Sequence, residues 1–469
     1  MGQSLFAGGS GDAEYDGTAV MLARLDLRGF TGDLIAAVAR RPAADDTEKV
    51  AAVGEIVRTV RAQGDAALRD YTARFDDCTV DELRVPPADL KTALESIPTE
   101  LRDALEYARA EITAYHEAQV VPEIVHERDG VHIREVMVPV DRAGCYVPGG
   151  RASYPSTVLM TTIPARVAGV PEVALCVPPA VDGSVPEATL AAAQLVGVDE
   201  VYRVGGAQAI AALAYGTESI RAADVVYGPG NEYVALAKRA VAADVATDYA
   251  GPSEIVAVAD TTVRADLVAI DLLAQAEHGP GGHVVLVTWD EGVADAVDAA
   301  VDALLAEAPR REDIESTLAT GGRSVLVDDV EQALAVANAI APEHLELLTA
   351  DVENLVPLVR NAGAVFCGPW TPTVVGDYVA GTNHMLPTDR AARFASALRV
   401  DSFLKHVHIV TMDEPALRRV ARHIQALAAV EGLDEHARSV TLRTSETQRS
   451  AGRATGSAKR SRPDKEGQP

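Results

Sequence analysis

The feature that most constrains the fold is an alternation of short apolar runs with Ala-rich helical segments between about Val131 and Cys367. The runs are rich in Val and Ile, as are strands that are buried on both faces. The segments between them repeat apolar residues at three- and four-residue spacing, which is typical of amphipathic helices. Such an alternation predicts an α/β fold in which helices cover both faces of parallel sheets.

The apolar runs are numerous enough to form one sheet or two. The strands that we expect are VHIREVMVPV, EVALCVPP, EVYRVG, DVVYGPG, EIVAVAD, HVVLVTW, SVLVDD and GAVFCG. The loop YAGPSE near position 250 lies halfway along this series, so it joins two doubly wound, Rossmann-like units. The expected organisation is a disordered N-terminus at 1–20, an N-terminal helical region at 21–130, Rossmann-like units at 131–252 and 253–386, a small C-terminal helical domain with little strand at 387–443, and a disordered tail at 444–469.

Charge and cysteine usage narrow the class of protein. The formal net charge of −27 argues against a nucleic-acid backbone or an anionic membrane surface as a partner. The four cysteines lie far apart without a CxxC pair, which is typical of a reducing compartment. The first residues show neither a basic leader nor an apolar signal core, and no apolar run is long enough to span a bilayer. We therefore expect a soluble, cytoplasmic protein.

The segment LLAQAEHGPGGH contains the strongest local signal. Gln275 and His278 are three residues apart on one face of a predicted helix, which the following Gly-Pro-Gly-Gly ends. An imidazole with an amide oxygen is a workable first half of a zinc site. A histidine that interacts favourably with the helix dipole explains the spacing equally simply, and for an isolated pair this is the better interpretation.

The segment APEHLELL places Glu343 and His344 side by side at the start of a predicted strand. A carboxyl group and an imidazole suit general acid–base chemistry when they are partly desolvated. An ordinary polar loop is the alternative.

Two further segments bring polar residues together. In VVGDYVAGTNHMLPT, glycines and a proline impose an irregular path on Asp377, Asn383 and His384, as a binding loop or a turn-rich connector would require. In AVEGLDEHARSV, Glu431 and His436 flank a glycine, so one helical turn and a kink can direct both to one point. A solvated helix face is the alternative for the second pair.

Three Gly-rich turns precede predicted helices, where backbone amides attract phosphate. They are GCYVPGGRASYPS, VGGAQAIAA and GPGNEYVALAK, and none matches the dinucleotide fingerprint G-x-G-x-x-G. Cys145, beside the first turn, could serve as a nucleophile for aldehyde oxidation. A small apolar residue at a buried strand end is the simpler interpretation of this cysteine.

Taken in order, CYVPGG, GGAQAIAALAYGT, GPGN, GPSE, LLAQAEH, PEHLE, GDYVAGTNH and EGLDEHARSV resemble the histidinol dehydrogenase family from about Asp46 to Arg443. The resemblance implies one zinc ion per site and an NAD-dependent, two-step oxidation of L-histidinol to L-histidine through L-histidinaldehyde. The zinc ligands that it implies are Gln275, His278, Asp377 and His436. The substrate contacts that it implies are Ser253, His344, Glu431 and these zinc ligands.

The resemblance also implies NAD contacts at Tyr146, Gln208 and Asn231, within the first Rossmann-like unit. It implies a homodimer in which the C-terminal segment completes the partner's site, so that Glu431 and His436 act in trans. In this scheme His344 takes the alcohol proton and Glu343 activates water on the aldehyde, and Cys145 has no chemical role. A zinc hydrolase that uses the same metal cluster without NAD is the alternative function, and a non-catalytic binding module is a third hypothesis.

Overall fold

The computed structural model of the protein describes residues 22–38, 47–149, 152–198, 200–249, 251–279 and 281–445. These residues form two compact units. The first unit contains the described residues up to Val120 and from Pro139 to Leu404, and the second contains Val121–Val138 and the residues from Lys405 onward. The two segments predicted to be disordered, 1–20 and 444–469, lie outside the described residues except for positions 444 and 445.

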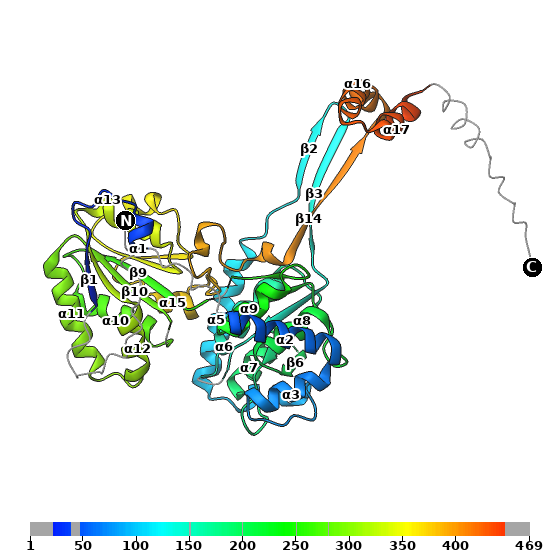
Figure 1. Ribbon diagram of the computed structural model, residues 1–469. Helices are drawn as coiled ribbons and strands as arrows, with labels where there is room; N and C mark the ends of the chain where they lie inside the picture. Colours follow the sequence, from blue (N-terminus) through cyan, green and yellow to red (C-terminus); the bar gives the residue numbers. More distant parts are fainter. Residues whose placement is uncertain are drawn as a thin grey trace, which may run out of the picture. The chain divides into compact units, whose positions relative to one another are not determined.

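The described part of the first unit contains two parallel β-sheets (Figure 1). The first sheet has the order β6-β5-β4-β7-β8 and is formed by β4 (Arg142–Tyr146), β5 (Glu172–Val177), β6 (Glu200–Arg203), β7 (Val225–Tyr227) and β8 (Ala246–Thr247). The second sheet has the order β1-β11-β10-β9-β12-β13 and is formed by β1 (Ala23–Asp26), β9 (Glu254–Ala259), β10 (His283–Thr288), β11 (Gly322–Leu326), β12 (His344–Leu348) and β13 (Ala364–Cys367).

The two sheets share one winding pattern. In each, the earliest strand of the repeat, β4 or β9, lies in the middle, the next two strands extend to one side, and the last two extend to the other. This is the order of a doubly wound α/β unit. The break between the units falls between Thr247 and Glu254, at the YAGPSE loop. The predicted fold class, with two doubly wound parallel sheets, is confirmed.

Helices cover both faces of each sheet, which explains the continuously apolar strands. The connecting helices are α6 (Pro155–Val167), α7 (Glu187–Leu195), α8 (Gly206–Tyr215) and α9 (Glu232–Val241) in the first sheet, and α10 (Ala265–Ala276), α11 (Glu291–Leu305), α12 (Arg311–Gly321) and α13 (Val330–Ile340) in the second. Along β9, Ile255 and Ala257 alternate with Val256 and Val258, and the two pairs belong to separate buried clusters on opposite faces.

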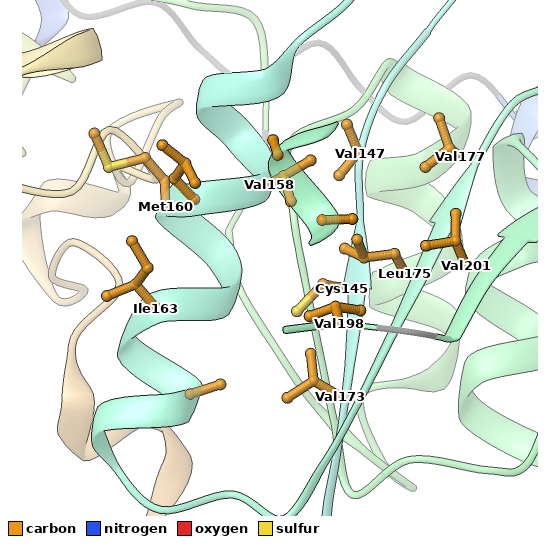
Figure 2. Packing of buried hydrophobic residues seen from close by; sticks show 14 of the residues in the cluster. Cys145, Val147, Val158, Met160, Ile163, Val173, Leu175, Val177, Val198 and Val201 are labelled. Carbon is orange, nitrogen blue, oxygen red and sulfur yellow. The ribbon is translucent and has the colours of Figure 1, made fainter. Parts of the chain in front are cut away.

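Figure 2 shows the same packing beside the first sheet. Val158, Met160 and Ile163 of α6 belong to one buried cluster with Cys145 of β4 and Leu175 of β5. Small and branched side chains fill this core, so helix and sheet approach closely without large aromatic rings. The low aromatic content of the chain, 4%, is thus compatible with a dense interior.

The N-terminal region is helical as predicted, but it is not a separate layer. Helices α2 (Thr47–Gln63), α3 (Asp65–Phe75), α4 (Pro87–Ser96) and α5 (Thr99–Glu117) follow one another, and α2, α4 and α5 pack against α8, α7 and α6 of the first sheet. Before them, β1 joins the edge of the second sheet beside β11, and α1 (Leu34–Val38) packs on α13. Residues 21–130 are therefore divided between the two sheets, with 121–130 in the second unit.

The second unit contains a three-stranded sheet of order β14-β3-β2, followed by two helices. Its elements are β2 (Ile124–Arg128), β3 (Val131–Pro139), β14 (Leu404–Met412), α16 (Glu414–Glu431) and α17 (Asp434–Thr444). Two expectations were wrong here. VHIREVMVPV is not a strand of the first Rossmann-like unit, because Asp129 and Gly130 both adopt positive φ and turn β3 back along β2. The C-terminal domain also contains a nine-residue strand, β14. Among the described helices, none is long and apolar enough to cross a membrane.

The close approach of two strand ends in the first sheet depends on Gly228, which follows β7. Its φ is +142°, and a Cβ atom there would lie 1.9 Å from the Tyr146 carbonyl oxygen at the end of β4. We expect Gly228→Ala to lower the free energy of unfolding by about 3 kcal/mol or more, through backbone strain and steric overlap.

Chemical denaturation measures this loss. Gly368→Ala is the matched control, because Gly368 also has a positive φ, +80°, but a Cβ atom there meets nothing within 4 Å. The control should lose only about 1–2 kcal/mol. Equal losses in the two variants would contradict the steric argument.

Candidate active site

Glu343 and His344 lie at the amino-terminal end of β12, next to the start of β9. The backbone N–H of Glu254, the first residue of β9, donates to Glu343 Oε2 at 3.0 Å. The backbone carbonyl of the same residue lies 3.1 Å from His344 Nδ1. Because a carbonyl oxygen only accepts, Nδ1 carries the proton of a neutral ring, and Nε2 is left able to accept one.

Burial shifts both of these groups in the direction that general acid–base chemistry requires. Glu343 is 6% exposed and His344 is 4% exposed. Burial raises the pKa of Glu343 to about 8 and lowers the pKa of His344. Near neutral pH the imidazole is therefore a neutral base, and the carboxyl group titrates close to the working range of an enzyme. The Ser253 hydroxyl donates a further hydrogen bond to Glu343.

Gln275 and His278 approach this pair from the end of α10. The helix ends at Ala276, and Gly279, with a φ of +108°, follows the turn. His278 thus lies just beyond the helix, where its backbone N–H donates to the Gln275 carbonyl at 3.3 Å and its side chain is exposed. Gln275 is 4% exposed, and its Nε2 has no hydrogen-bond partner. The helix end is thus as predicted, but only Gln275 of the two lies within the helix.

Asp377 lies in the short helix α15 (Thr373–Tyr378), at the start of the predicted GDYVAGTNH loop. Its carboxylate partly opposes the lowering of the pKa of His278, His344 and His384, so it lies near all three rings. The Asp377 carbonyl lies 3.0 Å from His384 Nδ1, which orients that ring. Asn383 Nδ2 donates to the Met160 carbonyl at 2.7 Å and anchors the loop to α6.

The first unit therefore brings together Ser253, His278, Glu343, His344 and Asp377. Gln275 lies three residues before His278, in the last turn of α10. The two remaining predicted site residues belong to the second unit. Glu431 is the last residue of α16 and His436 lies in the first turn and a half of α17, with Gly432 in a left-handed conformation between the helices. Both side chains are exposed. The predicted kink between them is present.

The donors in this cluster fit a zinc ion chemically. Gln275 offers an amide oxygen, His278 an imidazole nitrogen and Asp377 a carboxylate oxygen, and zinc accepts each of these. Within the part of the chain that the structure describes, no three His, Cys, Asp or Glu side chains are arranged to hold one metal ion.

The predicted NAD contacts lie at the carboxyl edge of the first sheet. Tyr146 ends β4, Gln208 lies in the first turn of α8, and Asn231 caps α9 after β7. The strand order reverses between β4 and β7, which is where doubly wound sheets bind ligands. The Gly206 N–H donates to the Tyr146 hydroxyl at 3.1 Å, and the buried Gln208 Oε1 has no partner.

Sequence reasoning missed three buried acids near the site: Glu254, Asp271 and Glu346. Burial, together with the Glu343 carboxyl, raises the pKa of Glu254 well above its usual value. A usable signal existed for Glu346, which interrupts the apolar strand HLELL two residues after His344 and so lies on the same face.

Cys145 is fully buried in β4, and burial raises the pKa of its thiol to about 12. A thiol in this environment is a poor nucleophile. The interpretation as a small apolar residue at a buried strand end is therefore the correct one.

Comparison with known proteins agrees with this geometry. A family model described as histidinol dehydrogenase matches residues 39–444. Histidinol dehydrogenase of Rhizobium meliloti is 48% identical over 408 residues, covering 86% of this chain and 93% of that protein. The Synechococcus enzyme of the same name is 50% identical over 397 residues, covering 84% and 92%.

A solved structure extends the likeness to the fold. The crystal structure of histidinol dehydrogenase from Elizabethkingia anophelis superimposes with a TM-score of 0.85 at 34% identity, covering 90% of this chain and 98% of that one. Sequence and fold agree over almost all of the described chain. The chain belongs to the histidinol dehydrogenase family of oxidoreductases.

Proposed function

We propose that the protein oxidises L-histidinol to L-histidine through L-histidinaldehyde, as the last steps of histidine biosynthesis, with zinc and NAD. The observation that carries the proposal is the Glu343–His344 pair. Two adjacent residues, both held by the backbone of Glu254, supply a neutral imidazole base and a carboxyl group with a raised pKa. A four-electron oxidation needs two successive proton acceptors, one for the alcohol and one for the water that adds to the aldehyde.

The proposed zinc ligands are Gln275, His278, Asp377 and His436. When bound, zinc supplies a Lewis acid that orients and polarises the substrate. The proximity of His278 and Asp377 supports this choice. The proposed substrate contacts are the same four residues with Ser253, His344 and Glu431.

The order of proton transfers follows from the two environments. His344 Nε2, left free by the Nδ1 contact, takes the hydroxyl proton of histidinol. Glu343 then takes a proton from the water that adds to the aldehyde, and the Ser253 hydroxyl holds its carboxylate in place. The proposed NAD contacts are Tyr146, Gln208 and Asn231, and NAD, when bound, supplies the hydride acceptor for both oxidations.

A direct assay tests the whole proposal. Zinc-loaded protein should form two NADH for each L-histidinol consumed, which the absorbance of NADH measures. A strong chelator should abolish this activity, and added zinc should restore it. A zinc-loaded protein that forms no NADH from histidinol, and whose thermal stability does not respond to saturating NAD, would instead favour a zinc hydrolase.

Single substitutions should slow one of the two oxidations without the other. We expect Glu343→Gln to carry out the first oxidation but to slow aldehyde oxidation by roughly 10²–10⁴-fold, because an amide cannot accept the proton of water. In the wild type, aldehyde oxidation should accelerate as the pH rises through about 8, because burial raises the pKa of Glu343 to that value and only the ionised form is a base. This acceleration should be absent from the variant.

His344→Asn is the matched control for this comparison. It should impair alcohol oxidation while retaining zinc and the oxidation of supplied histidinaldehyde. Stopped-flow measurement of NADH with each substrate distinguishes the two steps. If both variants slow the same step equally, the assignment of separate roles is wrong.

We further propose a homodimer in which Glu431 and His436 complete the partner's site. The second unit supports this proposal because few side chains of its two helices are buried. Among its described helical residues, only Ala416, Ala428 and Val440 are buried, whereas Val430 is 89% exposed and Leu427 is 65% exposed. A surface this apolar needs another protein surface to cover it.

Complementation tests the shared site. Chains with His436→Ala and chains with His344→Ala should each be inactive alone. Refolded together, they should recover about one quarter of wild-type activity, because half of the dimers are mixed and each mixed dimer has one intact site. Recovery is checked by NADH formation after the mixture is shown to be dimeric. If a verified mixed dimer recovers no activity, each site is built from the residues of a single chain and the proposal is wrong.

We also propose that the enzyme works in the cytoplasm. All four cysteines are free, and three of them are buried. Free thiols of this kind are typical of proteins kept in a reducing compartment.

A further inference from the structure

A second layer of polar residues accompanies the proposed site residues. Each of three elements that carry site residues has another buried polar residue one structural repeat away on the same face. These are Asp271, four residues before Gln275 on α10; Glu346, two residues after His344 on β12; and Thr373, four residues before Asp377 on α15. Spacings of four on a helix and two on a strand keep each pair on one face.

The three residues of this second layer lie close to one another. The Thr373 backbone N–H donates to Glu346 Oε1 at 3.1 Å, and Glu346 is fully buried. The Asp271 carboxyl lies close enough to Glu346 to act on it electrostatically, and Asp271 is 9% exposed. The three elements therefore approach one another at two positions, at the proposed site and at this second layer.

Two buried atoms of these residues have no hydrogen-bond partner. One is an acceptor, Glu346 Oε2, and the other is a donor, Gln275 Nε2. Buried polar atoms are nearly always paired in folded proteins, so each of these unpaired atoms needs an explanation. Helical side chains lean toward the helix N-terminus, which tilts Gln275 toward the turn that carries Asp271.

The chemistry of an amide ligand supplies that explanation. Only the oxygen of a glutamine side chain binds zinc, and its NH₂ group cannot. If Oε1 faces the metal, Nε2 faces the opposite way and needs an acceptor, which the buried carboxyl groups can provide. A carboxylate ligand would need no such support, because its two oxygens are equivalent.

We propose that Asp271 and Glu346 are positioning residues for Gln275: with the metal bound, these carboxyl groups accept the hydrogen bond that its amide nitrogen lacks in this structure, and they thereby turn its amide oxygen toward the metal. This inference rests on the proposed zinc site. It assigns a role to two buried acids that take no part in the proposed proton transfers.

Zinc affinity, measured by competition with a chromophoric chelator, tests the proposal without any activity measurement. We expect Asp271→Ala to weaken zinc binding by roughly 10–100-fold. Asp271→Asn should lose much less, because it keeps an acceptor oxygen at the same position. Asp266→Ala is the matched control on the same helix, since the Asp266 side chain is half-exposed and pairs with Arg264. This control should leave zinc affinity unchanged.

Thermal unfolding of the metal-free proteins distinguishes positioning from a structural role. A positioning role predicts that Asp271→Ala leaves the apo Tm unchanged or raises it, because a buried acid has been removed. A lowered apo Tm with unchanged zinc affinity would overturn the proposal. If Asp271→Ala fails to fold, Glu346→Met, which has a similar length but no acceptor oxygen, takes its place in the same comparison and should also weaken zinc binding.

A double-mutant cycle isolates the contact with Gln275. In a Gln275→Glu background, adding Asp271→Ala should no longer weaken zinc binding, because a carboxylate ligand needs no orientation. Equal losses in both backgrounds would overturn the proposal. Wild-type protein that binds zinc but does not oxidise histidinol would sink the proposed function alone, whereas wild-type protein that binds no zinc would sink both.

Discussion

The parallel pairing of β9 with β12 is the interaction on which the site depends. It places residues about ninety positions apart in register, His344 opposite Ile255. The backbone of a single residue, Glu254, then binds both groups: its N–H donates to the Glu343 carboxyl group, and its carbonyl accepts from His344 Nδ1. Neighbouring residues on a strand point to opposite faces, but Glu343 precedes β12, so both side chains can be engaged at the strand end. Any shift in this register would separate the base from its orienting carbonyl.

The two sheets share a strand order but use opposite edges. The proposed NAD contacts follow β4 and β7, at the carboxyl edge of the first sheet, as expected for doubly wound folds. The acid–base residues of the second sheet lie at its amino edge, where α10 ends and brings Gln275 and His278. At the carboxyl edge of that sheet, Asp260 binds the Ala350 N–H at 2.9 Å and joins β9 to β12 internally. The same winding therefore provides two different kinds of site.

The sequence predicts those parts of the structure that local periodicity determines. Most strands and helices between β5 and β13 follow from the alternation of apolar runs, and the end of α10 follows from the glycines after it. The central strand of the first sheet, β4, and the two-residue strand β8 were not predicted. The pairing of β1 with β11 joins residues about three hundred positions apart, and no local pattern near Ala23 specifies it. Asp271 and Glu346 were missed for a related reason, because a charged residue in a periodic segment usually marks the solvent face. Only the packing of α10, β12 and α15 reveals that both carboxyl groups are buried.

The second unit shows how folding and catalysis can depend on one surface. Leu427 and Val430 are exposed on α16, next to Glu431, and Leu433 follows it before α17. The apolar side chains that need to be covered and the polar residues proposed for the partner's site therefore lie on the same short stretch of chain. An interface that buries the first group also holds the second in place, so the stability of the unit and the completion of the site become one requirement. A separately folded C-terminal domain would need its own core to achieve the same positioning, and the described residues of α16 and α17 bury too few apolar side chains to form one.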